Sequence, residues 1–113
     1  MLNLLIIDDE KYIRKILNEI LSKEGYVIDE AVDGDEGWNK FYINTYDAVL
    51  CDIKMPKMDG LEFLAKAQKL NAEIPIIMIS SLGDVETAVD AVKRGAFDYL
   101  PKPPDLNRLL ITL

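Results

Sequence analysis

Short apolar segments alternate with longer polar and apolar segments along the whole chain. The short segments are rich in Leu, Ile and Val, and several are nearly continuous, which is typical of strands buried on both faces of a sheet. They predict strands at residues 2–7, 26–31, 47–51, 74–79 and 97–100.

The longer segments carry apolar residues three or four positions apart, so each forms one stripe along a helix. The stripes consist of Ile13, Ile16, Leu17, Ile20 and Leu21, of Leu61, Leu64, Ala65 and Leu70, and of Val85, Ala88, Val89 and Val92 before a terminating Gly95. A further helix carries Trp38, Phe41 and Tyr42.

Residues that cap helices mark several of the helix starts. Asp33 and Glu36 resemble a capping box, Asp59 precedes the third helix, and Pro104 suits the first turn of a final helix. Residues 81–84 offer a start for the fourth helix. Only a short segment follows Pro103, so we expect a truncated last helix and a chain that is a fragment.

A strand–helix unit repeated five times predicts an α/β fold, a doubly wound parallel sheet with helices on both faces. Right-handed crossovers and short loops favour the flavodoxin-like strand order 2-1-3-4-5. A chain of 113 residues provides one domain, which we assign to residues 1–113.

Composition excludes several classes of function. One cysteine forbids an internal disulfide, and the absence of histidine removes the usual zinc sites and the Ser-His-Asp mechanisms. A net charge of −7 argues against direct nucleic-acid binding. No apolar segment is long enough to cross a membrane, and the first residues do not resemble a signal peptide, so we expect a cytoplasmic protein.

Three carboxylates are expected to converge where the winding of the sheet reverses, between strands one and three. Asp8 and Asp9 end the first strand and Asp52 ends the third. A single aspartate after a strand is more often a turn or cap residue, but three at one edge repel one another and have no donors. A hard divalent cation with oxygen ligands resolves this repulsion, which indicates Mg²⁺.

Ser80 and Lys102 follow the fourth and fifth strands at the same edge of the sheet. Together with Asp52 they bring a carboxylate nucleophile, a hydroxyl donor and an ammonium group to one place. These groups suit a phosphoryl group, whose oxygens need neutralisation and hydrogen bonds while a carboxylate attacks in line.

The motifs Asp8-Asp9, Asp52-Ile-Lys-Met-Pro-Lys-Met-Asp-Gly60, Ile79-Ser80 and Tyr99-Leu-Pro-Lys-Pro103 occur in this order over almost the whole chain. In this respect the sequence resembles the receiver domains of bacterial two-component response regulators. The segment from Gly95 to Pro103 resembles regulators in which a receiver precedes an AAA-type ATPase and a helix-turn-helix domain. The strand order given above is partly taken from the chemotaxis regulator of this family.

The resemblance implies that Asp52 accepts a phosphoryl group from a sensor histidine kinase. Mg²⁺ would be bound by Asp9, Asp52 and the backbone carbonyl of Lys54, with Asp8 acting through water. Such a domain is a signalling switch rather than an enzyme, because it catalyses only its own phosphorylation and dephosphorylation.

The resemblance also implies how the signal leaves the site. Lys102 would pair with the acceptor and then with the phosphoryl oxygens, and Ser80 would move towards them while Tyr99 turns inward. The fourth helix, fifth strand and fifth helix would then control an output domain or a partner. The resemblance also implies a homodimer that forms through the face of the fourth and fifth helices. The Lys102–Pro103 peptide bond is expected to be cis, and Lys54 and Leu82 stand at variable positions that overlook the phosphoryl group.

Three other functions compete with this interpretation. A Mg²⁺-dependent phosphatase of the haloacid-dehalogenase type also uses an Asp nucleophile but needs an acid where Lys54 stands. A flavodoxin-like electron carrier needs a neutral phosphate loop in place of Asp8-Asp9-Glu10. A docking module that is never phosphorylated would not need the acidic, hydroxyl and lysine groups together.

Overall fold

The structure, a computed structural model, describes residues 2–81, 83 and 85–102. The described elements are β1 (Asn3–Ile7), α1 (Lys11–Lys23), β2 (Val27–Ala31), α2 (Gly34–Ile43), β3 (Ala48–Asp52), α3 (Gly60–Leu70), β4 (Ile76–Ser80), α4 (Val85–Lys93) and β5 (Asp98–Pro101). All neighbouring strands pair in parallel in the order β2-β1-β3-β4-β5. The predicted fold class and winding order are therefore confirmed.

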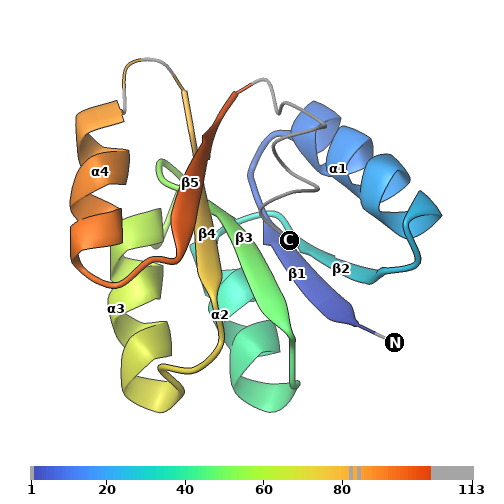
Figure 1. The fold of residues 1–113 in the computed structure, drawn as a ribbon, viewed down its shortest axis with the longest axis horizontal. Helices are drawn as coiled ribbons and strands as arrows, with labels where there is room; N and C mark the ends of the chain where they lie inside the picture. Colours follow the sequence, from blue (N-terminus) through green and yellow to red (C-terminus); the bar gives the residue numbers. More distant parts are fainter. Residues whose placement is uncertain (1, 82, 84, 103–113) are drawn as a thin grey trace.

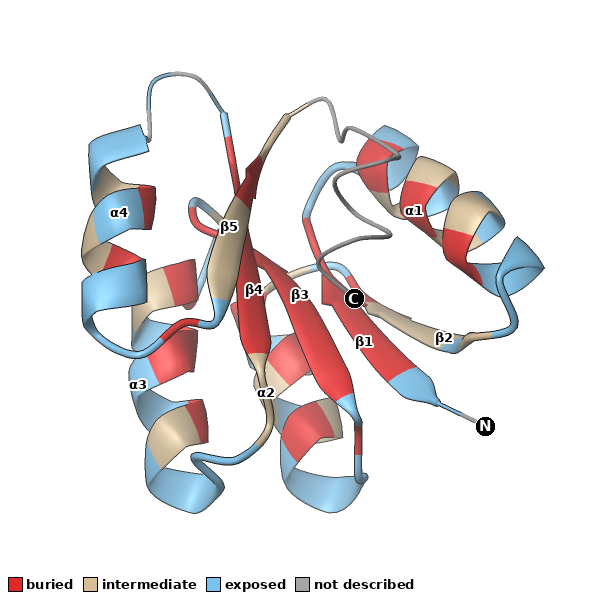
Figure 2. Ribbon diagram, viewed as in Figure 1, coloured by how far each residue is buried: buried red, intermediate tan, exposed pale blue. Residues whose placement is uncertain are grey.

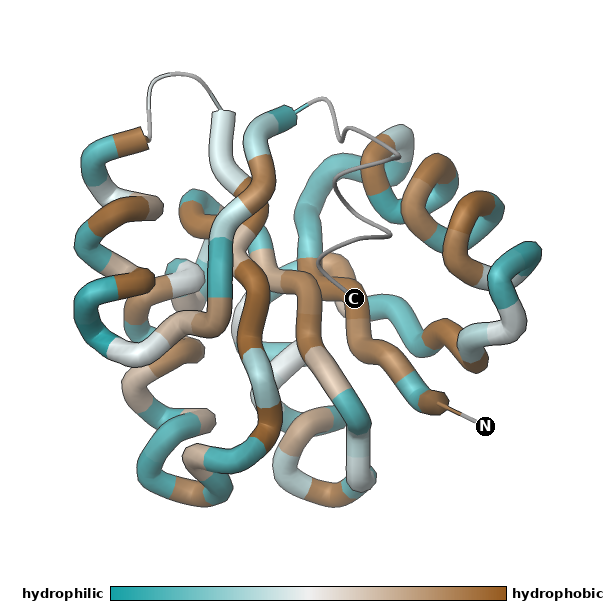
Figure 3. Tube along the Cα trace, in the orientation of Figure 1, coloured by the Kyte–Doolittle hydropathy of each residue, from teal (hydrophilic) through white to brown (hydrophobic). Residues whose placement is uncertain are grey.

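Alternate residues of each central strand enter two separate cores. Leu4 and Ile6 of β1 pack with α1 on one face, while Leu5 and Ile7 pack with α2, α3 and α4 on the other. Figure 1 shows α1 alone on its side of the sheet within the described chain. The central strands are continuously buried and largely hydrophobic (Figures 2 and 3). Burial on both faces explains their nearly unbroken apolar sequences.

The predicted signals for the second and third helix starts and the fourth helix end are confirmed. Asp33 Oδ1 accepts a hydrogen bond of 2.8 Å from the backbone N–H of Glu36, and Asp59 Oδ1 accepts one of 2.9 Å from that of Glu62. After α4, Gly95 adopts a φ of +117°, a conformation that side chains disfavour. This glycine allows the chain to turn sharply from α4 into β5.

The apolar stripe predicted for the fourth helix is wrong in part. Val85, Val89 and Val92 remain 37–39% exposed, whereas Ala88 and Ala91 are fully buried against β4 and β5. Small side chains bring a helix close to a sheet, and the face that packs is then the alanine face rather than the valine face. The predicted strands are correct to within two residues at each end.

Some predictions concern parts of the chain beyond this description. The final helix, the Lys102–Pro103 peptide bond and Leu82 lie outside the described residues. Among the described helices, none has the length and apolar character that a bilayer span requires.

Candidate functional site

The register of the sheet places four of the predicted side chains at one edge. Ile7 is paired with Cys51, so the next residues on these adjacent strands are Asp8 and Asp52. Asp52 is in turn paired with Ile79. Ser80 is paired with Pro101, and its carbonyl accepts a hydrogen bond of 2.8 Å from the backbone N–H of Lys102. The carboxyl ends of β1, β3, β4 and β5 thus carry Asp8, Asp52, Ser80 and Lys102.

Four carboxylates form one cluster at this edge. One oxygen from each of Asp8, Asp9, Glu10 and Asp52 lies within 4.8 Å of the others. Asp8 is fully buried and Asp52 is 4% exposed, while Asp9 and Glu10 face solvent. The three predicted aspartates therefore meet. Glu10 was not predicted as a site residue, although its position directly after Asp8-Asp9 was a usable signal.

Lys102 inserts its ammonium group among these carboxylates. Its Nζ lies 3.2 Å from Oδ2 of Asp8, 3.2 Å from Oδ2 of Asp52 and 2.8 Å from Oε1 of Glu10. Burial alone would lower the pKa of Lys102, but the hydrogen bond to Glu10 and the charges of Asp8 and Asp52 outweigh burial and raise this pKa above its ordinary value. Lys102 is therefore a fixed positive charge.

One lysine does not neutralise the buried carboxylates. Burial, and then the charge of Asp8, raise the pKa of Asp52 to about 7. Burial also raises the pKa of Asp8, against the opposing effects of the Glu10 backbone N–H and Lys102. The charged form of both carboxylates is thus disfavoured, and a second cation at this position would favour it.

The carboxylate oxygens of Asp8 also indicate that a metal ion fits the cluster. Within the described chain, Oδ2 of Asp8 is buried and accepts no hydrogen bond, although it forms an ion pair with Lys102. Oδ1 of Asp8 is occupied by the backbone N–H of Glu10 at 2.8 Å. A buried, charged oxygen whose partner among the described residues is one ammonium group suits coordination of a hard cation, and an all-oxygen donor set is the one that Mg²⁺ prefers.

The remaining predicted residues lie around the acceptor. Ser80 is 1% exposed, and its Oγ has no hydrogen-bond partner among the described residues. Tyr99 is half-buried and packs against the core beneath α2, α3 and α4. The residue two positions after Asp52, Lys54, is exposed. The hydroxyl of Ser80 thus lies at the acceptor's edge of the sheet with its hydrogen-bonding capacity unused.

The loop after Asp52 is held tightly by neighbouring backbone. A Cβ on Gly60 would collide with the carbonyl oxygen of Asp52 and the Cα of Ile53, and a Cβ on Gly34 would collide with the carbonyl of Met58. The N–H of Gly60 also donates a hydrogen bond of 2.7 Å to the carbonyl of Ile53. These contacts leave the acceptor strand and its loop little freedom to shift.

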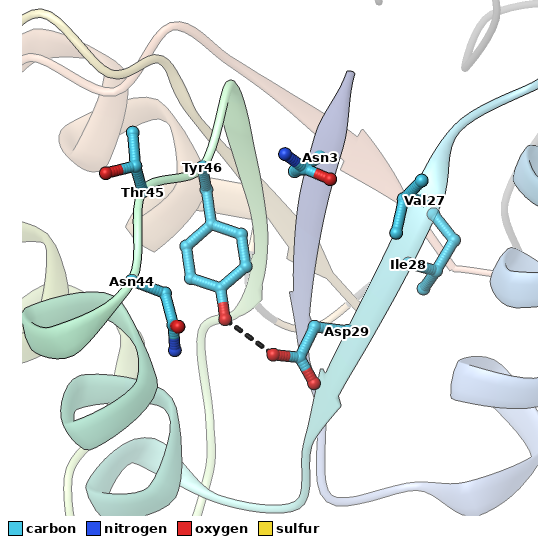
Figure 4. A pocket seen from close by; sticks show the side chains of 7 residues that line it. All are labelled: Asn3, Val27, Ile28, Asp29, Asn44, Thr45 and Tyr46. Atoms are coloured by element: carbon cyan, nitrogen blue, oxygen red, sulfur yellow. Dashed lines mark hydrogen bonds between the residues drawn. The ribbon is translucent and has the colours of Figure 1, made fainter. Parts of the chain in front are cut away.

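A separate cavity of about 360 Å³ lies near the opposite edge of the sheet (Figure 4). The Tyr46 hydroxyl donates a hydrogen bond of 2.6 Å to Oδ2 of Asp29, and Lys40 Nζ lies 3.1 Å from Oδ1. Burial would raise the pKa of Asp29, but these two partners outweigh it and lower the pKa. The lining residues are Asn3, Val27, Ile28, Asp29, Asn44, Thr45 and Tyr46.

Comparison with known proteins identifies the family of the chain. The sequence profile of the response regulator receiver domain matches residues 4–113. The transcriptional regulatory protein ZraR of Klebsiella oxytoca is 39% identical over 111 residues, which cover 98% of this chain and 25% of ZraR. The transcriptional regulatory protein DltR of Streptococcus agalactiae is 36% identical over 109 residues, covering 96% of this chain and 49% of DltR. The chain thus spans between a quarter and a half of these relatives.

Solved structures show the same similarity. A receiver domain protein from Clostridium thermocellum superposes with a TM-score of 0.93 at 33% identity, covering 99% of this chain and 90% of that one. NtrX from Brucella abortus, crystallised with ADP, superposes with a TM-score of 0.92 at 37% identity, covering 97% of this chain and 25% of NtrX. On the match of the profile, the identities and the superposed folds, the chain belongs to the response regulator receiver domain family.

Proposed function

We propose that this domain is a signalling switch that is activated when Asp52 accepts a phosphoryl group from a phosphohistidine of a sensor histidine kinase. The observation that carries the proposal is the position of Asp52, a buried carboxylate at the edge of the sheet beside a lysine and further acids. Membership of the receiver family supports the same function.

The transfer requires a nucleophile and compensation of charge. A carboxylate oxygen of Asp52 attacks the phosphorus, the P–N bond to the histidine breaks, and its electron pair returns to the imidazole. Lys102 lies within ion-pair distance of Asp52 and neutralises the phosphoryl oxygens as charge develops. Bound Mg²⁺ would add positive charge there, held by Asp9, Asp52 and the Lys54 carbonyl, with Asp8 acting through water.

The switch uses the hydroxyl of Ser80, which has no hydrogen-bond partner within the described part of the chain. A phosphoryl oxygen on Asp52 offers this hydroxyl an acceptor, so phosphorylation favours a conformation in which Ser80 moves towards Asp52. Tyr99 on β5 fills the space that Ser80 leaves. Helix α4 packs beside β5 and carries exposed valines, so this face changes shape and hydrophobicity when the equilibrium shifts.

The changed face controls a further domain or partner. The transcriptional regulatory proteins that the chain resembles are longer than this chain, and NtrX binds ADP in its crystal structure. We propose a C-terminal output, an ATPase with a DNA-binding domain, in a cytoplasmic protein that pairs with a second copy through α4 and β5. The 113-residue domain itself does not contact nucleic acid and is not an enzyme with a separate substrate.

The direct test is to incubate the protein with Mg²⁺ and acetyl phosphate and to count added phosphoryl groups by intact-protein mass spectrometry. We expect one group on the wild type and none on Asp52→Asn. Asp59→Asn is a matched control, because Asp59 is an exposed carboxylate of the same loop and asparagine also caps helices. This control should be labelled like the wild type.

Other results would support the competing functions. Multiple turnover of a phosphate ester such as p-nitrophenyl phosphate would indicate a phosphatase, and a bound flavin would indicate an electron carrier. An unlabelled wild type that still binds Mg²⁺ and partners would indicate a docking module. Each of these results would contradict the proposed switch.

A further inference from the structure

Arg14 links helix α1 to the backbone of the acidic loop. Its Nη1 donates a hydrogen bond of 2.8 Å to the backbone carbonyl of Asp8. Its Nε donates one of 3.2 Å to Oε1 of Glu30 on β2. The side chain is 13% exposed, so these contacts are largely shielded from water. Two donors on different sides of one planar group fix both the position and the plane of the guanidinium.

The location of Arg14 in α1 explains how it reaches the loop. Side chains of a helix point towards its N-terminus, and Arg14 lies near the start of α1. A positive charge near a helix N-terminus is locally unfavourable because of the helix dipole, and α1 has no acidic residue in its first turn. The hydrogen bond to Asp8 and the ion pair with Glu30 offset this cost.

Glu30 is itself held in place. Its second carboxylate oxygen accepts a hydrogen bond of 2.7 Å from Nδ2 of Asn18, one turn along α1 from Arg14. Glu30 on β2 is paired with Ile6 on β1, and Ile6 lies two residues before Asp8 in the sequence. Arg14, Asn18 and Glu30 therefore form a support that ties α1 and β2 to the end of β1.

This support bears on the metal-binding carboxylates. The carbonyl of Asp8 belongs to the peptide that leads into Asp9, so Arg14 fixes the backbone between the two aspartates. Asp8 is also held by its N–H, which donates to the carbonyl of Ala31 at 3.1 Å. With both of its backbone groups fixed, the chain at Asp8 cannot rotate without breaking the contact with Arg14.

We propose that Arg14 is a positioning residue for the divalent cation: it holds the Asp8–Asp9 backbone so that both carboxylates are directed into the metal site. This inference rests on the proposed function, since it assumes that Mg²⁺ binds the cluster. It goes beyond that function by giving a role to a residue that touches neither the cation nor the phosphoryl group.

An alternative role for Arg14 predicts the opposite change in Mg²⁺ affinity. If Arg14 acted only as a nearby positive charge, it would repel Mg²⁺, so Arg14→Met would bind Mg²⁺ more tightly and Arg14→Lys would bind it as the wild type does. If Arg14 positions the loop, both variants bind Mg²⁺ more weakly, because a lysine cannot make both directed contacts. Loss of a residue that orients metal ligands typically weakens affinity by roughly 10- to 100-fold.

The experiment is a calorimetric Mg²⁺ titration of the 113-residue chain and its variants, well below their unfolding midpoints. We expect the Mg²⁺ dissociation constant to rise in Arg14→Lys and Arg14→Met. Arg94→Lys is the matched control, because Arg94 forms an exposed ion pair of 2.9 Å with Asp90 on α4. Its dissociation constant should not change.

Three results are decisive. An Arg14→Lys variant that melts earlier but binds Mg²⁺ like the wild type, or binds it more tightly, overturns the positioning role. If both Arg14 variants fail to fold, Asn18→Ala provides the test by loosening Glu30, and an unchanged dissociation constant there overturns the role equally. A wild type that does not bind Mg²⁺ overturns the proposed function instead, so the two failures are distinguishable.

Discussion

The ammonium group of Lys102 lies 3.2 Å from the carboxylate of Asp52, although a large part of the chain separates the two residues. The contact exists because β3 and β5 end at the same edge of the sheet, with β4 between them. In the metal-free domain, this lysine is the counter-ion of a crowded group of acids.

Replacing Lys102 by methionine should destabilise the metal-free domain at neutral pH. Asp8 and Asp52 would lose their ion pairs with Lys102, whose side chain is 12% exposed. Breaking a buried ion pair lowers the free energy of unfolding by about 3–5 kcal/mol. Because Glu10, the third partner of Lys102, faces solvent, we expect a loss at or below the lower end of this range. Urea unfolding without Mg²⁺ measures the loss. Lys15→Met on the exposed face of α1 is the control, and an equal loss there would contradict the prediction.

Replacing Asp52 by asparagine should have the opposite effect on the metal-free domain. The substitution removes one of two buried like charges while nearly preserving shape, so the free energy of unfolding at neutral pH should rise by about 1–3 kcal/mol. Mg²⁺ should raise the melting temperature of the wild type but hardly that of Asp52→Asn. Thermal unfolding with and without Mg²⁺ tests both statements, and a less stable metal-free variant would refute the first.

The hydrogen bond between Tyr46 and Asp29 predicts a pH dependence. The pKa of Asp29 is lowered in the folded protein, so its contribution to stability is present above its ordinary pKa of 3.8 and is lost as the pH falls further. Tyr46→Phe removes the hydroxyl and keeps the ring. Because Asp29 is 42% exposed, we expect a loss of under about 1 kcal/mol at pH 7 that shrinks at pH 3. Urea unfolding at both pH values measures it, and a loss that grows on acidification would contradict this account.

Gly34 provides a test of the tight loop beside the acceptor. A Cβ at Gly34 would collide with the backbone of Met58, which is a less adaptable neighbour than a flexible side chain. Gly34→Ala should therefore lower stability by about 1–3 kcal/mol. Gly83→Ala is the control, because no atom of the described residues lies within 4 Å of a Cβ there. Equal melting temperatures of the two variants would contradict the prediction, because they would show that the backbone at Met58 moves aside at little cost.

Sequence patterns, with a strand order partly taken from the family resemblance, were sufficient for the sheet and for the meeting of Asp8, Asp9 and Asp52. Both follow from one rule, since parallel strands in a doubly wound sheet bring their carboxyl ends together. The rule does not specify which neighbouring polar groups also reach the site. Glu10 contacts Lys102 because of the local path of the chain into α1, and no periodicity encodes that path.

The errors have equally physical causes. The valine stripe of α4 has the right spacing for a buried face, but burial depends on which side chains let the helix approach the sheet, and the alanines do so better. Arg14 was missed because its partner is a backbone carbonyl, which every residue possesses and which therefore leaves no mark in the sequence.

The alignment of four strand ends limits how the gene for such a domain can change in length. Deleting one residue inside β3 would move Asp52 by about 3.3 Å and turn its side chain to the other side of the sheet. The connection between α2 and β3, at the far edge, is exposed at Asn44 and Thr45 and carries none of the four residues at the aligned strand ends. Insertions and deletions should therefore accumulate at the amino ends of the strands, while the carboxyl ends keep a constant residue count.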